Sequence, residues 1–443
     1  MNKKYSELAE LFRSEKTDEE ILDFLLNYHK NDIADMMAGM TEEERKRLYH
    51  LLGAQKVAEI FKYIEEPRKY IRELSVESAA RVISEMDSDD AVDLLEDLDP
   101  EEKEQIVRML DEDAKKDVKM LLSYDEEEIG SCMTTNYICI PENLTIRQAM
   151  SELVKQAGEN DNIMTIYVVD EKGVFAGAID LKDLIRAREN AHLEDLVLKS
   201  YPYVTDHEKI DDCMDRILDY AEDSIPVLSE DKKILGVITS EDLIEMVDNE
   251  MGEDYAKLAG LTAEEDLKEP TLQSMKKRLP WLIILLFLGM AVSSVVGLFE
   301  NVVAVLPIVI CFQSLVLDMA GNVGTQSLAV TIRVLMDENL TGKQKFQLVV
   351  KEVKTGSLNG ALLGIMALLC LGVYVHLFKG YTWMGAFGIS GCVGVSLLVA
   401  MAISSAVGTV IPMFFHKIKV DPAVASGPLI TTVNDMAWLL LIR

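Results

Sequence analysis

Basic residues are scarce in the first part of this sequence, and acidic residues are scarce in the last part. Residues 1–275 hold 68 acids and 32 bases, whereas residues 276–443 hold 7 acids and 12 bases. The two net charges are therefore −36 and +5. A nucleic-acid-binding protein needs a basic surface, so the charge of the first region argues against that function. It suits a solvated region or one that binds multivalent cations.

The six cysteines show no CxxC pattern, which argues against a disulfide framework and a zinc site. A reducing cytosol therefore suits the acidic region. The N-terminus, Met1-Asn2-Lys3-Lys4, leads into a charged amphipathic run and lacks the features of a secretory signal. There is no arrangement of nucleophile and base and no glycine-rich phosphate loop, so nothing in the sequence favours an enzyme.

Residues 1–128 predict helices only, because apolar residues recur at spacings of three and four in several short stretches. We expect a wound stack of short helices. Its acids are concentrated in Asp87-Ser88-Asp89-Asp90 and Asp93. Such runs are usually solvated surface, and the sharper alternative is a site for a hard cation such as Mg²⁺, which prefers carboxylate oxygens. The expected helix breaks are Gly39, Gly53, Pro67 and Pro100.

Residues 129–245 change to Val- and Ile-rich strands, and one pattern occurs twice with a constant offset. In its first copy, the strand 165–170 precedes a second strand at 177–179 and a helix that begins around Asp183. A repeat of this length predicts two units that pack as a pair. The residues resemble a tandem of CBS domains, which are α/β modules.

CBS pairs often bind adenine nucleotides between their repeats. The resemblance implies a ribose contact from Asp183 and from its counterpart Asp242. Ala221 and Glu222 stand where nucleotide-binding members favour an aromatic side chain, which argues against ATP. An Asp at the start of a helix is also an ordinary partner of the helix dipole.

Residues 246–275 predict a charged connecting helix that ends at Pro270. It joins the acidic region to the apolar one, and it is either a mechanical coupler or an inert linker.

From Pro280 the chain is apolar and predicts five membrane spans of about 20 residues or more. Lysines and arginines precede the first span and fill the loops after the second and fourth spans. The positive-inside rule then places the N-terminus in the cytosol and the C-terminus outside. The last span is only just long enough, which fits a chain truncated at Arg443. The spans are Trp281–Phe299, Val302–Val334, Gly356–Phe378, Met384–Phe415 and Pro422–Ile442.

Polar residues line one face of the second span. Asp318, Asn322 and Gln326 are four residues apart and form a stripe, while Gly321 and Gly324 permit close backbone approach. Ionisable residues within a membrane normally face a protein interior or water. The stripe therefore indicates a path for an ion, with hydrogen bonding between helices as the alternative.

The last span carries acids as well. Asp421, Pro428 and Asp435 are seven residues apart, which predicts nearly one helix face, with the two acids about 21 Å apart. An Asp near mid-membrane costs about 2.5–3.5 kcal/mol. We expect a polar line from the entrance of the span to its depth, with a structural hydrogen bond to a neighbouring helix as the alternative.

The run Gly321-Asn322-Val323-Gly324-Thr325-Gln326 and the run from Asp421 to Asp435 look like the MgtE family of magnesium channels. The order of parts matches too. The resemblance implies an α-helical superhelical domain (1–128), tandem α/β CBS domains (129–245), a connecting or plug helix (246–275) and a five-helix transmembrane domain (276–443).

The resemblance further implies a homodimer in the lipid bilayer with its pore at the subunit interface. Asp435 matches the family's pore acid for hydrated Mg²⁺, and Asp421 matches the acid at the cytosolic mouth. The pore-lining positions are Asp318, Asn322, Gln326, Gly427, Pro428, Thr431 and Thr432.

The family also implies gating, in which intracellular Mg²⁺ bridges acids of the cytosolic parts and holds the pore shut. A switch requires that Mg²⁺ bind one form of the protein more tightly than the other. Bridging contacts that exist only in the closed form would supply this difference. Two other functions stay open: a coupled transporter of another divalent cation such as Co²⁺, and a non-transporting membrane sensor that reads nucleotide. The implied regulatory ligands are Glu59, Asp89, Asp93, Asp242, Glu245, Glu250, Glu253 and Asp254.

Overall fold

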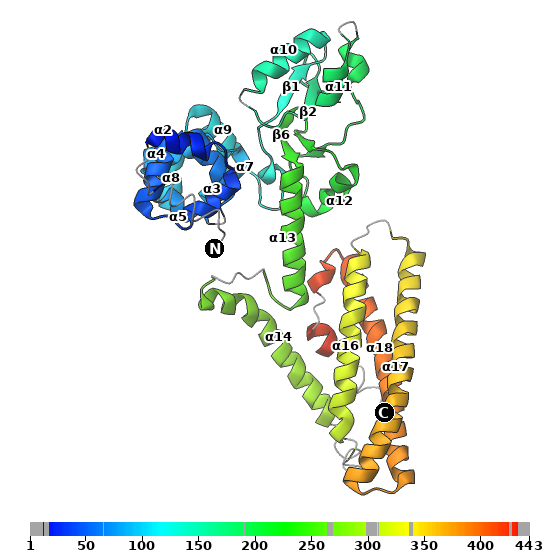
Figure 1. Cartoon of the computed structure of the whole chain (residues 1–443). Helices are drawn as coiled ribbons and strands as arrows, with labels where there is room; N and C mark the ends of the chain where they lie inside the picture. Colours follow the sequence, from blue (N-terminus) through cyan, green and yellow to red (C-terminus); the bar gives the residue numbers. More distant parts are fainter. Residues whose placement is uncertain are drawn as a thin grey trace. The chain divides into compact units, whose positions relative to one another are not determined.

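The chain divides into two compact units, Met1–Met246 and Val247–Arg443 (Figure 1). The computed structural model describes residues 12, 17–64, 66–158, 160–188, 191–263, 269–297, 308, 310–335, 340–424 and 428–432.

Short helices make up the first part of the first unit. Helix α4 packs on α6, α6 on α8 and α7 on α9, so that the helices wind around one another (blue to cyan in Figure 1). Three of the expected breaks are clear: Gly53 has a φ of +77° and kinks α4, while Pro67 and Pro100 begin helices. The helices are α2 (Asp18–Leu25), α3 (Lys30–Met37), α4 (Glu42–Phe61), α5 (Pro67–Ile71), α6 (Val76–Ser84), α7 (Ser88–Glu96), α8 (Pro100–Met109) and α9 (Glu112–Leu121).

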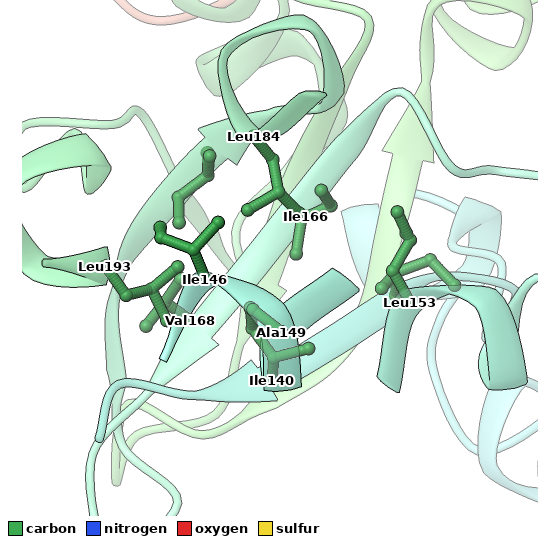
Figure 2. Close-up of a cluster of buried hydrophobic side chains, with 10 residues drawn as sticks. Ile140, Ile146, Ala149, Leu153, Ile166, Val168, Leu184 and Leu193 are labelled. Atoms are coloured by element: carbon green, nitrogen blue, oxygen red, sulfur yellow. The ribbon is translucent and has the colours of Figure 1, made fainter. Parts of the chain in front are cut away.

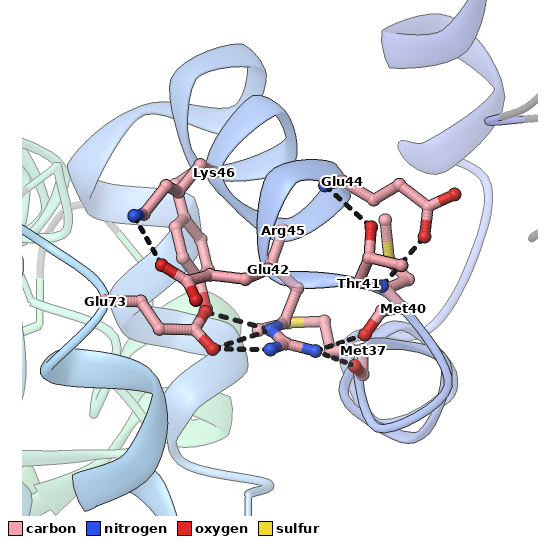
Figure 3. A network of polar contacts seen from close by, with 9 residues as sticks. Met37, Met40, Thr41, Glu42, Glu44, Arg45, Lys46 and Glu73 are labelled. Atoms are coloured by element: carbon pink, nitrogen blue, oxygen red, sulfur yellow. Dashed lines mark hydrogen bonds and ion pairs between the residues drawn. The ribbon is translucent and has the colours of Figure 1, made fainter.

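A buried ion pair ties α4 to the segment after α5. The guanidinium of Arg45 donates from Nε to Oε2 of Glu73 at 2.9 Å and also donates to the carbonyls of Met37 and Met40 (Figure 3). Both side chains are almost fully buried, at 7% and 10% exposure. Removing one partner of such a pair leaves the other charge buried and uncompensated.

We expect Glu73→Gln to lower the free energy of unfolding of the cytosolic unit by about 3 kcal/mol or more. Urea unfolding of a soluble fragment ending at Thr262 measures it. The matched control is Glu42→Gln, which breaks the exposed pair of Glu42 with Lys46 one helical turn away (2.6 Å) and should leave the free energy of unfolding nearly unchanged. Equal losses in the two variants would contradict the prediction.

Two three-stranded sheets follow, with the orders β1-β2-β3 and β4-β5-β6. In each sheet the first strand is parallel to the second, and the second is antiparallel to the third. The repeat predicted from the sequence is confirmed, since β2, β3 and α11 recur as β5, β6 and α13. The elements are β1 (Ile138–Pro141), α10 (Ile146–Gln156), β2 (Thr165–Val169), β3 (Phe175–Asp180), α11 (Leu181–Arg186), β4 (Val204–Thr205), α12 (Ile210–Tyr220), β5 (Ser224–Leu228), β6 (Ile234–Thr239) and α13 (Ser240–Leu258).

Each repeat buries apolar side chains between its sheet and its helices. In the first repeat, Ile140 and Val168 of the sheet meet Ala149 and Leu153 of α10 (Figure 2). The repeats are joined by Tyr167, a fully buried residue of β2 whose hydroxyl lies 2.6 Å from Oγ of Ser224 in β5. The two units therefore pack as a pair.

The expectation of one connecting helix that continues to Pro270 is wrong. Helix α13 ends at Leu258, and Gly260 adopts a φ of +83° that stops it. The amide of Leu261 then donates to the carbonyl of Ala256 at 2.9 Å, which closes the helix end. Pro270 precedes a new helix, α14 (Thr271–Gly297), which runs through Pro280.

The second unit contains α14, α16 (Ile310–Leu335), α17 (Gly342–Lys379) and α18 (Trp383–Lys417). Three helices of the described part are long and apolar enough to cross a membrane, and they match the first, third and fourth predicted spans. Helix α16 has 26 residues, but its polar stripe lowers its apolar character. Of the fifth predicted span, the structure describes a 3₁₀ turn (Pro422–Val424) and helical residues 428–432.

Glycines set the spacing of the helices in this unit. A methyl group added at Gly364 of α17 or Gly394 of α18 would lie 2.7 Å from the backbone oxygen of the other residue. One added at Gly408 of α18 would lie 2.3 Å from the backbone oxygen of Gly324 in α16. The close approach expected at Gly324 is therefore confirmed, and it fixes α16 directly against α18.

Candidate functional site

The acids of α7 and the start of α13 face one another in the first unit. Asp87, Asp89 and Asp90 stand at the beginning of α7, and the carboxylates of Asp87, Asp89 and Asp90 all act on one another electrostatically. Asp242 of α13 raises the pKa of Asp89. Glu245, one turn further along α13, raises the pKa of Asp93. We call these six residues the acid cluster.

Hydrogen bonds position the α7 side of the acid cluster. The side chain of Asn136 donates to Asp87 at 2.8 Å, and the amide of Thr135 donates to Ser88 at 2.9 Å. On the other side, Asp242 caps α13 by accepting from the amide of Thr239 at 2.7 Å. Residues just before β1 thus hold the start of α7, and its own cap holds the start of α13, so that two helix starts rich in acids are fixed in place.

The environment penalises negative charge in the acid cluster. Burial and the neighbouring carboxylates raise the pKa of Asp89 and of Asp242, and burial raises the pKa of Asp90 to about 7. The pKa of Asp93 rises to about 6 through lost solvation and Glu245, although its side chain keeps contact with solvent. Among the described residues, Oδ1 of Asp89 is buried without a hydrogen-bond partner. Either protonation or a nearby cation would relieve this cost.

One cation that the chain itself supplies is Lys62, the residue that follows α4. Its ammonium lies 3.1 Å from the carboxylate of Glu241, which precedes Asp242. Burial lowers the pKa of Lys62, but Asp90 and Glu241 outweigh this effect and raise it. A single positive charge offsets only part of the negative charge that the acid cluster carries when it is ionised. In the described part of the chain, no three acidic, His or Cys side chains converge as a closed metal centre.

We expect the acid cluster to make stability fall as pH rises. The pKa of Asp90 is about 7 in the folded protein against an ordinary 3.8, so ionising it opposes folding between about pH 4 and pH 7. Asp90→Asn should therefore stabilise the cytosolic fragment at pH 8 relative to pH 5, by at most about 1.4 kcal/mol per pH unit across that window. Asp231→Asn, on an exposed turn, is the control, and a pH-independent effect of Asp90→Asn would contradict the prediction.

The remaining predicted ligands lie elsewhere. Glu59 of α4 pairs with Lys30 of α3 at 2.8 Å. Asp183 is exposed in the first turn of α11. Glu250, Glu253 and Asp254 lie in the second half of α13, within the second unit.

Asp421, the acid predicted at the cytosolic mouth of the pore, forms an ion pair with a lysine of α13. Its Oδ1 accepts from the amide of Ala423 at 2.8 Å, and its Oδ2 lies 2.9 Å from Nζ of Lys257 near the end of α13. Asp421 caps the 3₁₀ turn Pro422–Val424, so the predicted α-helical face does not extend unbroken from Asp421 to Pro428, and this part of the expectation is wrong. Asp435 and Gly427 lie outside the described residues.

The polar stripe of α16 is exposed in the single chain. Asp318, Asn322 and Gln326 all face outward, while Val316 and Ala320 on the other side of the helix pack in the core with α18. Helical residues 428–432 lie beside the stripe's helix, since Thr431 packs 3.1 Å from the position of a methyl group on Gly321. Pro428, Thr431 and Thr432 are partly exposed there.

Comparison with known proteins places these features in a family. Residues 313–442 match the model of the MgtE divalent cation transporter domain, and residues 28–127 match the MgtE intracellular N domain. Residues 127–190 and 193–249 each match the CBS domain. The magnesium transporter MgtE of Enterococcus faecalis is 37% identical over 100% of this chain and 96% of its own length. The chain belongs to the MgtE family of magnesium transporters.

Further MgtE proteins and a solved structure support this family membership. The magnesium transporter MgtE of Bacillus subtilis is 33% identical over 72% of this chain and 69% of its own length. A crystal structure of the soluble part of a magnesium transporter is 30% identical, covers 56% of this chain and 98% of that chain, and has a TM-score of 0.53. This chain is thus a membrane transporter with a cytosolic N-terminal region, and the fold class predicted from the sequence is confirmed.

Proposed function

We propose that this MgtE family member is a homodimeric channel that imports Mg²⁺ through a pore at its subunit interface, and that intracellular Mg²⁺ closes it. The observation that carries the pore is the outward-facing stripe of Asp318, Asn322 and Gln326 on α16. In a membrane this face would meet lipid, where an Asp costs about 2.5–3.5 kcal/mol. A second copy with the same stripe removes that cost and encloses a hydrophilic path.

The chemistry of this path suits a hydrated ion. Mg²⁺ keeps several of its waters and binds through few carboxylates. Amide and hydroxyl groups of Asn322, Gln326 and Thr432 would contact the water shell, and Asp435 from each subunit would supply the charge. Helix α16 can hold this geometry because Gly324 locks it against Gly408 of α18.

The acid cluster supports the regulatory half of the proposal. Its buried carboxylates repel one another, so divalent cations would favour the arrangement in which α7 and the start of α13 stay together. Loss of the cations would favour separation. Because the ion binds one arrangement better than the other, it shifts the equilibrium between them. Asp89, Asp93, Asp242 and Glu245 are the proposed ligands in the acid cluster, and Glu59, Glu250, Glu253 and Asp254 are proposed as further ligands of regulatory Mg²⁺.

Nucleotide is a further candidate for the CBS pair. A structure of the cytosolic domain of the Mg²⁺ channel MgtE in complex with ATP is 26% identical, covers 54% of this chain and 99% of that chain, and has a TM-score of 0.50. Asp183 is exposed and free to meet a ribose. Ala221 and Glu222 offer no aromatic surface for stacking a base, so we propose that any ATP binds weakly here.

The test of the proposed function is Mg²⁺ flux into proteoliposomes, with free Mg²⁺ on the cytosolic face set low and then high. We expect flux at low Mg²⁺ and none at high Mg²⁺. Flux that ignores cytosolic Mg²⁺ would remove the gating claim. No flux in either condition would favour a coupled transporter of another divalent cation or a non-transporting sensor.

The pore acid gives a second prediction. Asp435→Ala should abolish Mg²⁺ flux while the protein remains a folded dimer by size-exclusion chromatography, because the variant loses the charge that holds the hydrated ion. Asp435→Glu keeps the charge and should retain part of the flux. Full flux through the Ala variant would overturn the assignment of Asp435.

A further inference from the structure

The ammonium group of Lys257 lies between two carboxylates that come from different parts of the second unit. Its Nζ is 2.9 Å from Oδ2 of Asp421, which precedes the last apolar segment, and 3.1 Å from Oε2 of Glu253, one turn earlier on α13. Both acids were predicted to bind Mg²⁺. Burial lowers the pKa of Lys257, but the hydrogen bonds to Asp421 and Glu253 outweigh it and raise it, so the lysine is charged.

The end of α13 that carries Lys257 is held in place on a second side. Gly260 packs so closely on Trp281 of α14 that a methyl group there would lie 2.4 Å from the indole. The amide and the hydroxyl of Thr262 both donate to the carbonyl of Lys277 in α14, each at 3.1 Å. With its helix end fixed, Lys257 is only 29% exposed, and its ammonium is directed at Asp421.

We propose that Lys257 is a tethered cation that occupies the carboxylates of Asp421 and Glu253 and competes there with Mg²⁺. The lysine thereby sets the Mg²⁺ concentration at which this entrance site fills. This inference extends the proposed function to a named residue, since it assumes that Mg²⁺ reaches Asp421.

The competition follows from elementary electrostatics. A lysine ammonium is a compact single charge on a flexible stem. Mg²⁺ carries two charges, but it loses its waters reluctantly and therefore binds carboxylates largely as a hydrated ion. The ammonium is always present at high local concentration because the chain carries it. A divalent ion must therefore displace it, and removing the amine must make Mg²⁺ bind at lower concentration.

The experiment uses the full-length protein in nanodiscs and follows Trp281 fluorescence during a Mg²⁺ titration. The chain has three tryptophans, so Trp383→Phe and Trp438→Phe leave Trp281, next to Gly260, as the reporter. In this background, Lys257→Met should lower the Mg²⁺ midpoint about three- to tenfold, the range expected for losing a partly exposed ion pair to two acids. Lys257→Arg keeps the charge and should stay within about twofold of the parent.

Two controls separate competition from general electrostatics. Lys277→Met removes a lysine of similar exposure (22%) that pairs with Glu269 at 2.9 Å instead, and it should leave the midpoint unchanged. In an Asp421→Asn background, Lys257→Met should have no effect, because the shared ligand is gone. A midpoint that is unchanged or higher in Lys257→Met, or equally lowered in Lys277→Met, would overturn the proposal.

The fluorescence result is independent of transport. A lowered midpoint in a protein without Mg²⁺ flux would support the competition while removing the channel. Flux that high cytosolic Mg²⁺ shuts, together with an unmoved midpoint in Lys257→Met, would support the channel while removing the competition. In proteoliposomes with gated flux, Lys257→Met should close at a correspondingly lower Mg²⁺ concentration.

Discussion

The mutual repulsion of carboxylates that are brought together and partly desolvated is the constraint on which the rest of this structure depends. The start of α7 and the start of α13 place acids of two domains against each other, and burial raises the pKa of Asp89, Asp90 and Asp242. Among the described residues, Lys62 is a cation that meets this cluster, and it offsets only part of the cost. In the proposed regulation, a divalent cation that enters here would supply the missing positive charge.

Several of the acids predicted from the sequence to bind Mg²⁺ form ion pairs with lysines or lie beside such a pair. Lys30 pairs with Glu59, Lys62 with Glu241 beside Asp242, and Lys257 with Asp421 and Glu253. Each lysine neutralises one charge and leaves a surplus of negative charge around it. In the proposed regulation, a divalent ion would match that surplus better than a single ammonium does, and the occupancy of these acids would then follow the Mg²⁺ concentration.

In the membrane unit, close packing of the helices determines which polar residues stay exposed. Small residues let α17, α18 and α16 approach until their backbones touch, as at Gly364 with Gly394 and Gly324 with Gly408. This packing buries the apolar face of α16 and leaves Asp318, Asn322 and Gln326 exposed on the surface of the subunit. A face of that kind is unfavourable toward lipid, and in the proposed homodimer it would meet its symmetry mate instead.

Much of the fold follows from the sequence, because it depends on local residue chemistry. This holds for the helix breaks, for the strands and for the repeat in which β5 is the counterpart of β2. Composition likewise separated the acidic cytosolic region from the apolar one. Three features depended on tertiary structure: the stop of α13 at Gly260, whose close packing on Trp281 is long-range; the 3₁₀ turn after Asp421; and the partners of Lys62 and Lys257. Which lysine meets which acid is fixed by packing between elements far apart in the chain, and no periodicity or spacing in the sequence records it.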